Sequence, residues 1–195
     1  MKKYELTAEF IEQWGKKLFR IKALISFGSV EAGELGGYVE KEDNLAQDGD
    51  AWVCGNAWVC DDARVYGNAR VYGNAWVYGN ARVYGNAWVY GNARVCDDAR
   101  VCDDARVYGN ADYLLIGRIG SRFSFTTFFK NKDKGITVSC GCFLGTIAEF
   151  RAKVTDTHGN NKHAKMYNLA ADMAELQILG EEHFDKLNTN KSEPF

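Results

Sequence analysis

Between Ala51 and Asn110, hydrophobic and polar positions recur every six residues. Each repeat reads Ala-x-Val-x-Gly-Asn or Ala-x-Val-x-Asp-Asp, and ten repeats follow one another without interruption. Alanine and valine two residues apart share one side of an extended strand, whereas a 3.6-residue period would spread the valines around a helix. Gly-Asn provides a corner because both residues tolerate positive φ. Each repeat therefore predicts one short strand and one bend, whose small apolar side is buried only when repeats stack.

This run of hexads resembles the hexapeptide-repeat, left-handed parallel β-helix family, in which three hexads form one triangular coil. In that family the aliphatic residue and the small residue two before it fill the interior, so the resemblance places the Val and Ala series inside. It implies a mainly β protein with a solenoid of about four coils. The left hand comes from the resemblance alone, because the usual rule for parallel crossovers predicts the opposite hand. A right-handed β-solenoid is the alternative.

With three hexads per coil, residues 18 apart stack at roughly 4.8 Å, and the outward side chains form columns. Alternating Trp and Arg predicts stacking of guanidinium on indole, and an all-Arg column predicts compensation by the Asp-Asp corners. The asparagines Asn56, Asn74, Asn92 and Asn110 are expected to form a hydrogen-bonded ladder. The residues expected to bind a partner are Trp52, Arg70, Tyr72, Trp88, Tyr90, Arg106 and Tyr108 on one face, and Arg64, Arg82 and Arg100 on another.

The flanks of the repeat predict different structure. Residues 1–32 alternate as an N-terminal β cap, and 33–116 form the solenoid. Its first coil, Gly33–Asp50, is degenerate, with Leu45 at an Ala position and Gln47 at a Val position. The stretch from Gly36 to Trp52 resembles the opening segment of hexapeptide-repeat proteins found widely in bacteria and their phages.

Residues 117–187 predict a ββαα module, and 188–195 predict a frayed tail. One strand carries Phe123, Phe125 and Phe129 on one side, and the returning strand carries Ile136, Val138, Cys140 and Cys142. Thr146 and Glu149 form a capping box that starts a first helix. A second helix is expected over His163–Leu179. Its apolar stripe is expected to comprise Met166, Leu169, Ala170, Met173 and Leu176.

Composition narrows the function classes. The chain is 46% hydrophobic and 26% charged, which argues against global disorder, and its net charge of −2 argues against a general nucleic-acid coat. Its apolar runs are shorter than a bilayer requires, and no signal-peptide core follows Met1. We therefore expect a cytoplasmic protein without membrane contact, whose six cysteines are reduced thiols.

Two kinds of chemistry remain open. The resemblance implies an acyltransferase class, in which a histidine within or beside the coils acts as general base and an inserted loop builds the pocket. These coils contain no histidine and no insertion, so the candidates for a general base are His158 and His163. Cys140, Cys142, His158 and His163 together offer a zinc-compatible set, although the two cysteines share the parity of core residues. No cofactor is expected.

The sequence thus predicts a non-catalytic binding protein that presents aromatic and Arg columns to a protein partner. The alternatives are that the columns are only self-stabilising ladder packing, or that they bind a nucleotide or single-stranded nucleic acid. A competing class is an acyl-CoA-dependent or related transferase. A homo-oligomer, dimer or trimer, would cover part of the aromatic surface. The resemblance to phage and bacterial proteins implies a mobile-element role, such as an anti-CRISPR-like inhibitor of a host defence system.

Overall fold

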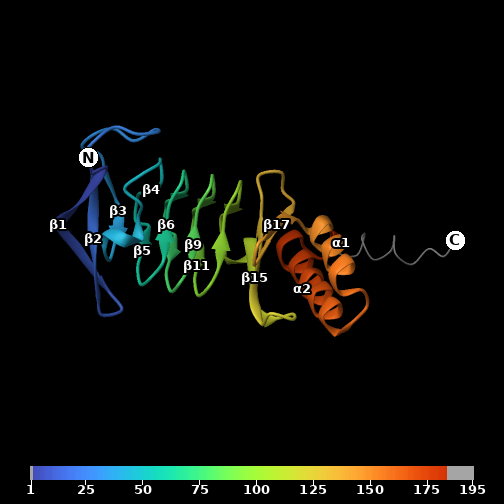
Figure 1. Ribbon diagram of the computed structural model, residues 1–195. Coiled ribbons are helices and arrows are strands. Elements are labelled where there is room, and N and C mark those ends of the chain that lie inside the picture. Colours follow the sequence, from blue (N-terminus) through green and yellow to red (C-terminus); the bar gives the residue numbers. More distant parts are fainter. Residues whose placement is uncertain (1, 184–195) are drawn as a thin grey trace. The chain divides into compact units, whose positions relative to one another are not determined.

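A computed structural model describes residues 2–183. The chain folds into two compact units, Met1–Asn110 and Ala111–Phe195. The protein is mainly β, as predicted, with a solenoid of about four turns preceded by a strand region. A module of antiparallel sheet and helices follows (Figure 1). The predicted tail at 188–195 lies outside the described residues.

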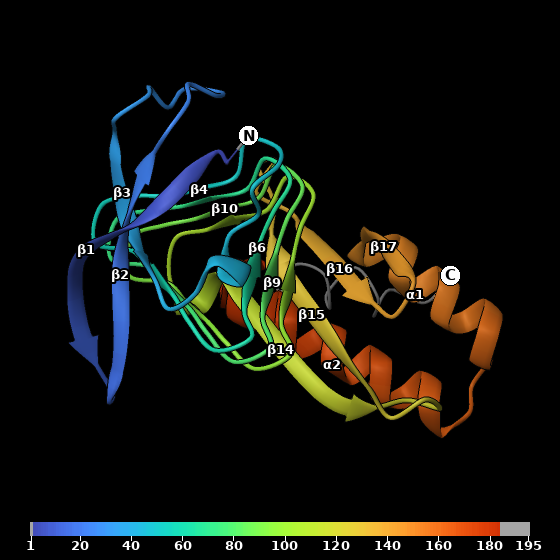
Figure 2. The ribbon, with the colours of Figure 1, turned by 60° about the vertical axis from the view of Figure 1, so that its left-hand side comes forward.

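Each hexad of the first unit folds into a two-residue strand, and every third strand joins the same parallel sheet. The pairing Arg64↔Arg82 joins residues 18 apart, so the predicted period is confirmed. Figure 2 shows the successive coils nearly superimposed. The strands are β4 (Trp52–Val53), β5 (Trp58–Val59), β6 (Arg64–Val65), β7 (Arg70–Val71), β8 (Trp76–Val77), β9 (Arg82–Val83), β10 (Trp88–Val89), β11 (Arg94–Val95), β12 (Arg100–Val101) and β13 (Arg106–Val107).

The alanines and valines fill the interior. Every Ala and Val of the ten hexads is fully buried, as the spacing predicted. At the corners Gly73 has φ +75, and a Cβ there would stand 3.1 Å from the amide nitrogen of Gly91 in the next coil. Asp61 adopts a similar φ of 60°, which explains why Asp-Asp can replace Gly-Asn. The hand of the coil stays a prediction.

The asparagine ladder is shorter than predicted. The side-chain amide of Asn56 donates to Asn74 at 3.3 Å, and that of Asn74 donates to Asn92 at the same distance. Asn110 instead accepts from the backbone N–H of Arg94 at 2.8 Å. The ladder therefore ends at Asn92, because Asn110 closes the last turn.

The first coil departs from the predicted register. Here β3 (Leu35–Val39) pairs with β5, and a bridge joins Leu45 to Val65, so the paired residues are 20 apart. Leu45 therefore occupies a Val position, and its predicted Ala position was wrong by two residues. Gly37 takes the interior Ala position, where a Cβ would lie 2.4 Å from the carbonyl oxygen of Ala57. The short 3-10 helix η1 (Glu42–Asn44) lies between the two.

The strands predicted within residues 1–32 form a hairpin. Here β1 (Tyr4–Gln13) pairs antiparallel with β2 (Lys16–Ala23), and β2 pairs with β3. The hairpin turns at Trp14 and Gly15, both with positive φ. It thereby extends the β3-β5-β8-β11 sheet of the solenoid.

The second unit has a four-stranded antiparallel sheet, whereas the sequence predicted only two strands. The capping box at the start of the first helix is confirmed, since Thr146 Oγ1 accepts from the Glu149 N–H at 3.2 Å. Phe123 lies in the exposed turn before its expected strand. The elements are η2 (Asn110–Asp112), which begins at the end of the first unit, β14 (Tyr113–Ile119), β15 (Ser124–Lys130), β16 (Ile136–Cys140), β17 (Phe143–Thr146), α1 (Ile147–His158) and α2 (Lys162–Leu179).

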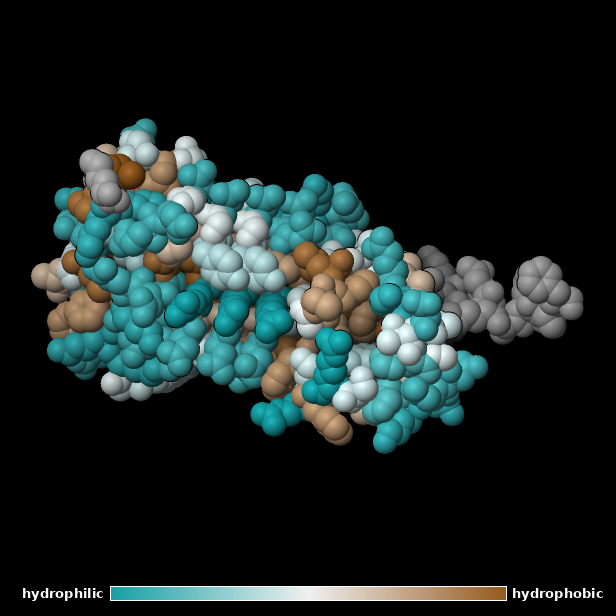
Figure 3. Space-filling view, in the orientation of Figure 1, coloured by the Kyte–Doolittle hydropathy of each residue, from teal (hydrophilic) through white to brown (hydrophobic). Residues whose placement is uncertain are grey.

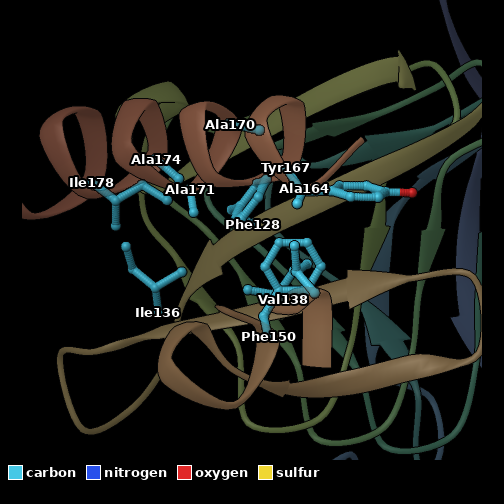
Figure 4. Close-up of a cluster of buried hydrophobic side chains, with 11 residues drawn as sticks. Phe128, Ile136, Val138, Phe150, Ala164, Tyr167, Ala170, Ala171, Ala174 and Ile178 are labelled. Carbon is cyan, nitrogen blue, oxygen red and sulfur yellow. The ribbon is translucent and has the colours of Figure 1, made fainter. Parts of the chain in front are cut away.

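The buried face of α2 is not the predicted one. Figure 4 shows α2 turning Ala171, Ala174 and Ile178 toward Phe128 and Ile136 of the sheet. Ala170 is buried as predicted. Four residues of the predicted stripe are instead 39–63% exposed, namely Met166, Leu169, Met173 and Leu176. Small alanines let the helix approach the sheet closely, which the larger residues would prevent. Neither α1 nor α2 has the length and apolar content of a membrane-spanning helix.

Candidate functional site

The most exposed of the predicted columns is an arginine face, which we define as Arg64, Arg82 and Arg100 with Tyr66 and Tyr84 beside them. The pairings Arg64↔Arg82 and Arg82↔Arg100 stack the three arginines in consecutive coils. All three are exposed. The Tyr66 and Tyr84 rings stack at 4.9 Å between centroids and 3° between planes. In Figure 3 rows of similarly coloured side chains run from coil to coil, as such columns require.

At one of the three Asp-Asp corners the carboxylates pair with lysines, whereas the sequence predicted that they compensate the arginine column. The Asp-Asp corner at Asp61 and Asp62 pairs with lysines of the N-terminal region: Lys16 bonds Asp61, and Lys41 contacts Asp62 at 2.8 Å. The hydrogen bond from Lys16 holds the pKa of Asp61 below its ordinary value. Within residues 2–183, neither the Arg64 nor the Arg82 guanidinium makes a hydrogen bond or an ion pair. Arg64 and Arg82 therefore present exposed guanidinium groups to which residues 2–183 contribute neither a hydrogen bond nor an ion pair.

The second predicted binding face carries mixed exposure. Arg106 lies 4.4 Å from the centroid of the Trp88 indole, which confirms the predicted stacking of guanidinium on indole. Tyr72 stacks on Tyr90 at 5.1 Å, and Tyr108 continues the series edge-on. Ladder packing within the chain thus covers part of the aromatic surface of this face, while Trp88 and Tyr108 are 39% and 62% exposed.

Trp52 requires a correction. Its side chain is 1% exposed, because Phe27 at 5.4 Å and Tyr4 at 6.3 Å between ring centroids cover it. A binding role for Trp52 is incompatible with this burial. Arg70, the next residue of the column, is half-buried. The N-terminal region therefore removes the start of this face from solvent.

The N-terminal hairpin also covers a third column. Trp14, at the hairpin turn, lies 5.0 Å from Trp58 and 5.2 Å from Trp76 between ring centroids, and Arg94 stacks on Trp76 at 4.1 Å. This contact of Trp14 was not predicted from the sequence. Trp14 lies two residues before a lysine-rich strand and outside the six-residue repeat. The spacing of residues therefore does not indicate that the hairpin packs against the coils.

One acidic group was missed by the sequence reasoning. The ligand atoms of Glu40, Cys60 and Asp61 lie within 4.8 Å of one another. Within residues 2–183, these three side chains are close enough to hold a metal ion together. The Lys16 ammonium already bonds both carboxylates, at 3.3 Å for Glu40. Burial and the neighbouring Asp61 raise the pKa of the Cys60 thiol to about 12. This group is therefore a half-buried ion-pair network that fastens the hairpin to the coils.

The candidate residues of the second unit meet in part. A hollow of about 190 Å³ is lined by Cys140, His158, Tyr167 and Arg122. The Thr126 hydroxyl donates to Cys140 Sγ at 3.2 Å, and burial raises the pKa of Tyr167. Within residues 2–183 no hydrogen bond joins Cys140 to His158, the contact that activates a thiol nucleophile.

The proposed zinc set does not come together as one group. Cys142 lies exposed in the turn after β16, beyond the strand on which it was expected. His163 lies 5.8 Å from His158 between ring centroids, and its Nδ1 is buried without a hydrogen-bond partner. Among residues 2–183, the set Cys140, Cys142, His158 and His163 does not bring three ligand atoms within 4.8 Å of one another.

Thiol reactivity should follow this burial. We expect iodoacetamide at pH 8 to modify the exposed Cys142 rapidly and to leave Cys60 and Cys102 unmodified, because both are fully buried and burial raises both pKa values. Peptide mass spectrometry after timed labelling measures this, with urea-denatured protein as the control in which all six react. Equal rates at Cys60 and Cys142 in native protein would contradict the structure.

A second hollow, of about 490 Å³, opens beside the arginine face where the first coil ends. Glu42, Asp43 and Ala46 line one side of it, and Arg64, Tyr66 and Arg82 line the other. The Ala46 N–H donates to the Val65 carbonyl just as the Tyr66 N–H donates to the Val83 carbonyl. Ala46 therefore stands in the tyrosine column, one coil before Tyr66.

Comparison with known proteins bears on the coils. The family model of the YdcK β-solenoid repeat matches residues 63–79, 75–91 and 99–111. No curated protein matches the chain. The match supports a β-solenoid repeat, while the left-handed hexapeptide class stays a prediction. The repeat segment of this chain is therefore a β-solenoid similar to the YdcK repeat.

Proposed function

We propose that this protein is a non-catalytic binding protein that holds an acidic surface of a partner protein on its arginine face. The observation that carries this proposal is the register of Arg64, Arg82 and Arg100, exposed in three consecutive coils. Stacking puts the backbones of these arginines at the interstrand spacing of roughly 5 Å, so their like charges repel one another. Carboxylates of a partner would relieve that repulsion.

The residue types suit such a contact. Arginine binds carboxylates in a bidentate manner and loses less freedom per hydrogen bond than lysine, and no lysine occurs between Asp43 and Phe129. Arginine and tyrosine are also enriched among the residues that dominate protein interfaces. The stacked rings of Tyr66 and Tyr84 supply apolar area beside the charges.

The scaffold is rigid, which favours binding. Backbone hydrogen bonds link every coil to the next, for example from the Arg64 N–H to the Ala81 carbonyl at 2.9 Å and from the Arg82 N–H to the Ala99 carbonyl at 2.9 Å. A surface that is already ordered loses little conformational entropy when a partner binds. Spacing along the column therefore selects a partner whose carboxylates repeat at a matching distance.

Other functional expectations remain predictions. The cytoplasmic location, the homo-oligomer and the mobile-element role have no counterpart among the contacts described above. The transferase alternative would use His158, which shares its hollow with Cys140 and Tyr167.

The test is capture of partner proteins by charge-reversal variants. The double variant Arg82→Glu/Arg100→Glu should lose, by at least tenfold, the proteins that the wild type retains from lysate of the cells that produce it. Truncating one partner of a buried interfacial charge pair costs about 2–5 kcal/mol, so reversing two charges should exceed a tenfold loss. Retention should also fall steeply with salt.

The matched control is Lys162→Glu/Lys165→Glu, which changes the net charge equally at two exposed positions of α2. It should retain the same proteins as the wild type. If the arginine variant and the wild type retain the same proteins, the arginine face is not the binding surface.

A further inference from the structure

The hollow beside the arginine face exists because, in the first coil, neither the tyrosine column nor the arginine column continues with a large outward side chain. Ala46 stands where the tyrosine column would continue past Tyr66. Asn44 stands where the arginine column would continue past Arg64, but it is fully buried and its amide donates to the carbonyls of Asp61 and Ala63 at 3.0 and 2.9 Å. The 20-residue spacing of this coil therefore leaves about 490 Å³ beside Tyr66.

One wall of this hollow is an aromatic ring at the end of a stack. Tyr84 lies parallel to Tyr66 on one side, with 3° between the planes. On the side toward the first coil, the stacked residue is Ala46, which has no ring. A planar ring bound there would continue the stack at the same spacing, and every nucleobase has such a face.

The charges around the hollow have two signs. Arg64 and Arg82 line it beside Tyr66, and guanidinium groups bind phosphate in a bidentate manner. Glu42 and Asp43 line the opposite side, and the Lys2 ammonium already binds the Glu42 carboxylate at 2.7 Å. The Asp43 carboxylate can therefore accept a hydrogen bond from an exocyclic amine. A ligand that fits therefore combines a flat ring bearing an amine with an anionic group.

The frame of the hollow is held in place by the N-terminal strand. The Tyr4 hydroxyl lies 2.8 Å from the Glu42 carbonyl and 2.7 Å from the Leu45 carbonyl. The Gln47 side chain accepts from the Lys3 N–H at 2.8 Å and donates to the Tyr4 carbonyl at 3.2 Å. These contacts fix η1 and the segment after it, so the hollow is preformed, and its volume is within the range of small-molecule sites.

We infer that this hollow binds a purine nucleotide, with its base on the Tyr66 ring, its exocyclic amine at Asp43, and its phosphate at Arg64 and Arg82. This ligand differs from the partner protein proposed above. It is bound by the purified chain alone, so failure of one proposal leaves the other standing.

Calorimetric titration of the purified chain with AMP tests the site. Wild-type protein should bind AMP at one site, and Tyr66→Leu should weaken binding by at least tenfold. Arg64→Gln should weaken AMP binding by a similar factor and leave adenosine binding unchanged, because adenosine lacks the phosphate. IMP, whose base has no exocyclic amine, should bind more weakly than AMP.

A second variant keeps the test independent of folding. Ala46→Phe places a ring in the hollow as the column would, so it should abolish AMP binding while tryptophan fluorescence stays native. The matched control Tyr90→Leu removes a ring from the stacked pair on another face and should leave AMP binding unchanged. No binding at millimolar AMP, or equal binding by wild type and Ala46→Phe, would overturn the inference. Loss of partner capture by Ala46→Phe without AMP binding would assign the hollow to a partner's aromatic side chain instead.

Discussion

Substitution Val83→Asp is expected to unfold the solenoid unit. Val83 is fully buried and pairs with Val65 in one neighbouring coil and Val101 in the other. An isolated buried carboxylate costs several kcal/mol even after relaxation, which approaches the roughly 5–15 kcal/mol total stability of a typical domain. Because each coil contacts only its neighbours, a break in a middle coil removes two interfaces at once.

Tryptophan fluorescence measures this directly, because all five tryptophans lie in the first unit, at Trp14, Trp52, Trp58, Trp76 and Trp88. The variant should show the emission of unfolded protein without denaturant. Val83→Ala, which removes two carbons, should instead lower the free energy of unfolding, measured by urea titration, by about 2 kcal/mol.

The matched control is Arg82→Asp, which puts the same carboxylate one residue earlier, on the outward side of the strand. It should keep native emission. A native urea midpoint for Val83→Asp would contradict the interior position of the valines.

The solenoid could be predicted because its pattern repeats. An alanine and a valine separated by one outward residue appear ten times, and no other regular structure buries all of them. Stacking then assigns each outward side chain to a column, so the register of Arg64 on Arg82 followed from spacing alone. Local periodicity carries this part of the fold, including the Tyr66 and Tyr84 stack.

The rest depends on contacts between distant parts of the chain. Gly37 and Leu45 occupy interior positions 20 residues before their partners, and the degenerate sequence around them allows either register. In α2 two apolar stripes compete, and close packing on the sheet favours the one with Ala171 and Ala174. Burial of Trp52 under Tyr4 and Phe27 likewise has no sequence signal.

Part of the candidate site was predictable from the repeat, and part was not. The arginine column was predicted, since it needs only the repeat. The hollow beside it was not, because it follows from the shifted register that puts Ala46 before Tyr66. Cys140 and His158 were grouped on ligand chemistry, and the sheet and helix bring them to one hollow without a hydrogen bond between them.

Substitution Arg151→Leu is expected to destabilise the second unit by about 3–5 kcal/mol, because it leaves a buried carboxylate without its cation. Arg151 Nη2 on α1 lies 2.7 Å from both Asp172 Oδ1 and Glu175 Oε2 on α2. The side chain of Glu175 is only 9% exposed. The two ion pairs of Arg151 therefore hold α1 and α2 together, although burying these charges has a desolvation cost.

The double variant Arg151→Leu/Glu175→Leu should recover most of the lost stability, because replacing a buried ion pair with apolar residues is often neutral. Urea unfolding followed by circular dichroism at 222 nm reports on this unit, because α1 and α2 both lie in it. Arg151→Lys should give an intermediate loss, since an ammonium keeps the charge but cannot contact both carboxylates with the same planar geometry. If the double variant is no more stable than Arg151→Leu, packing of the arginine side chain, and not its charge, holds α1 against α2.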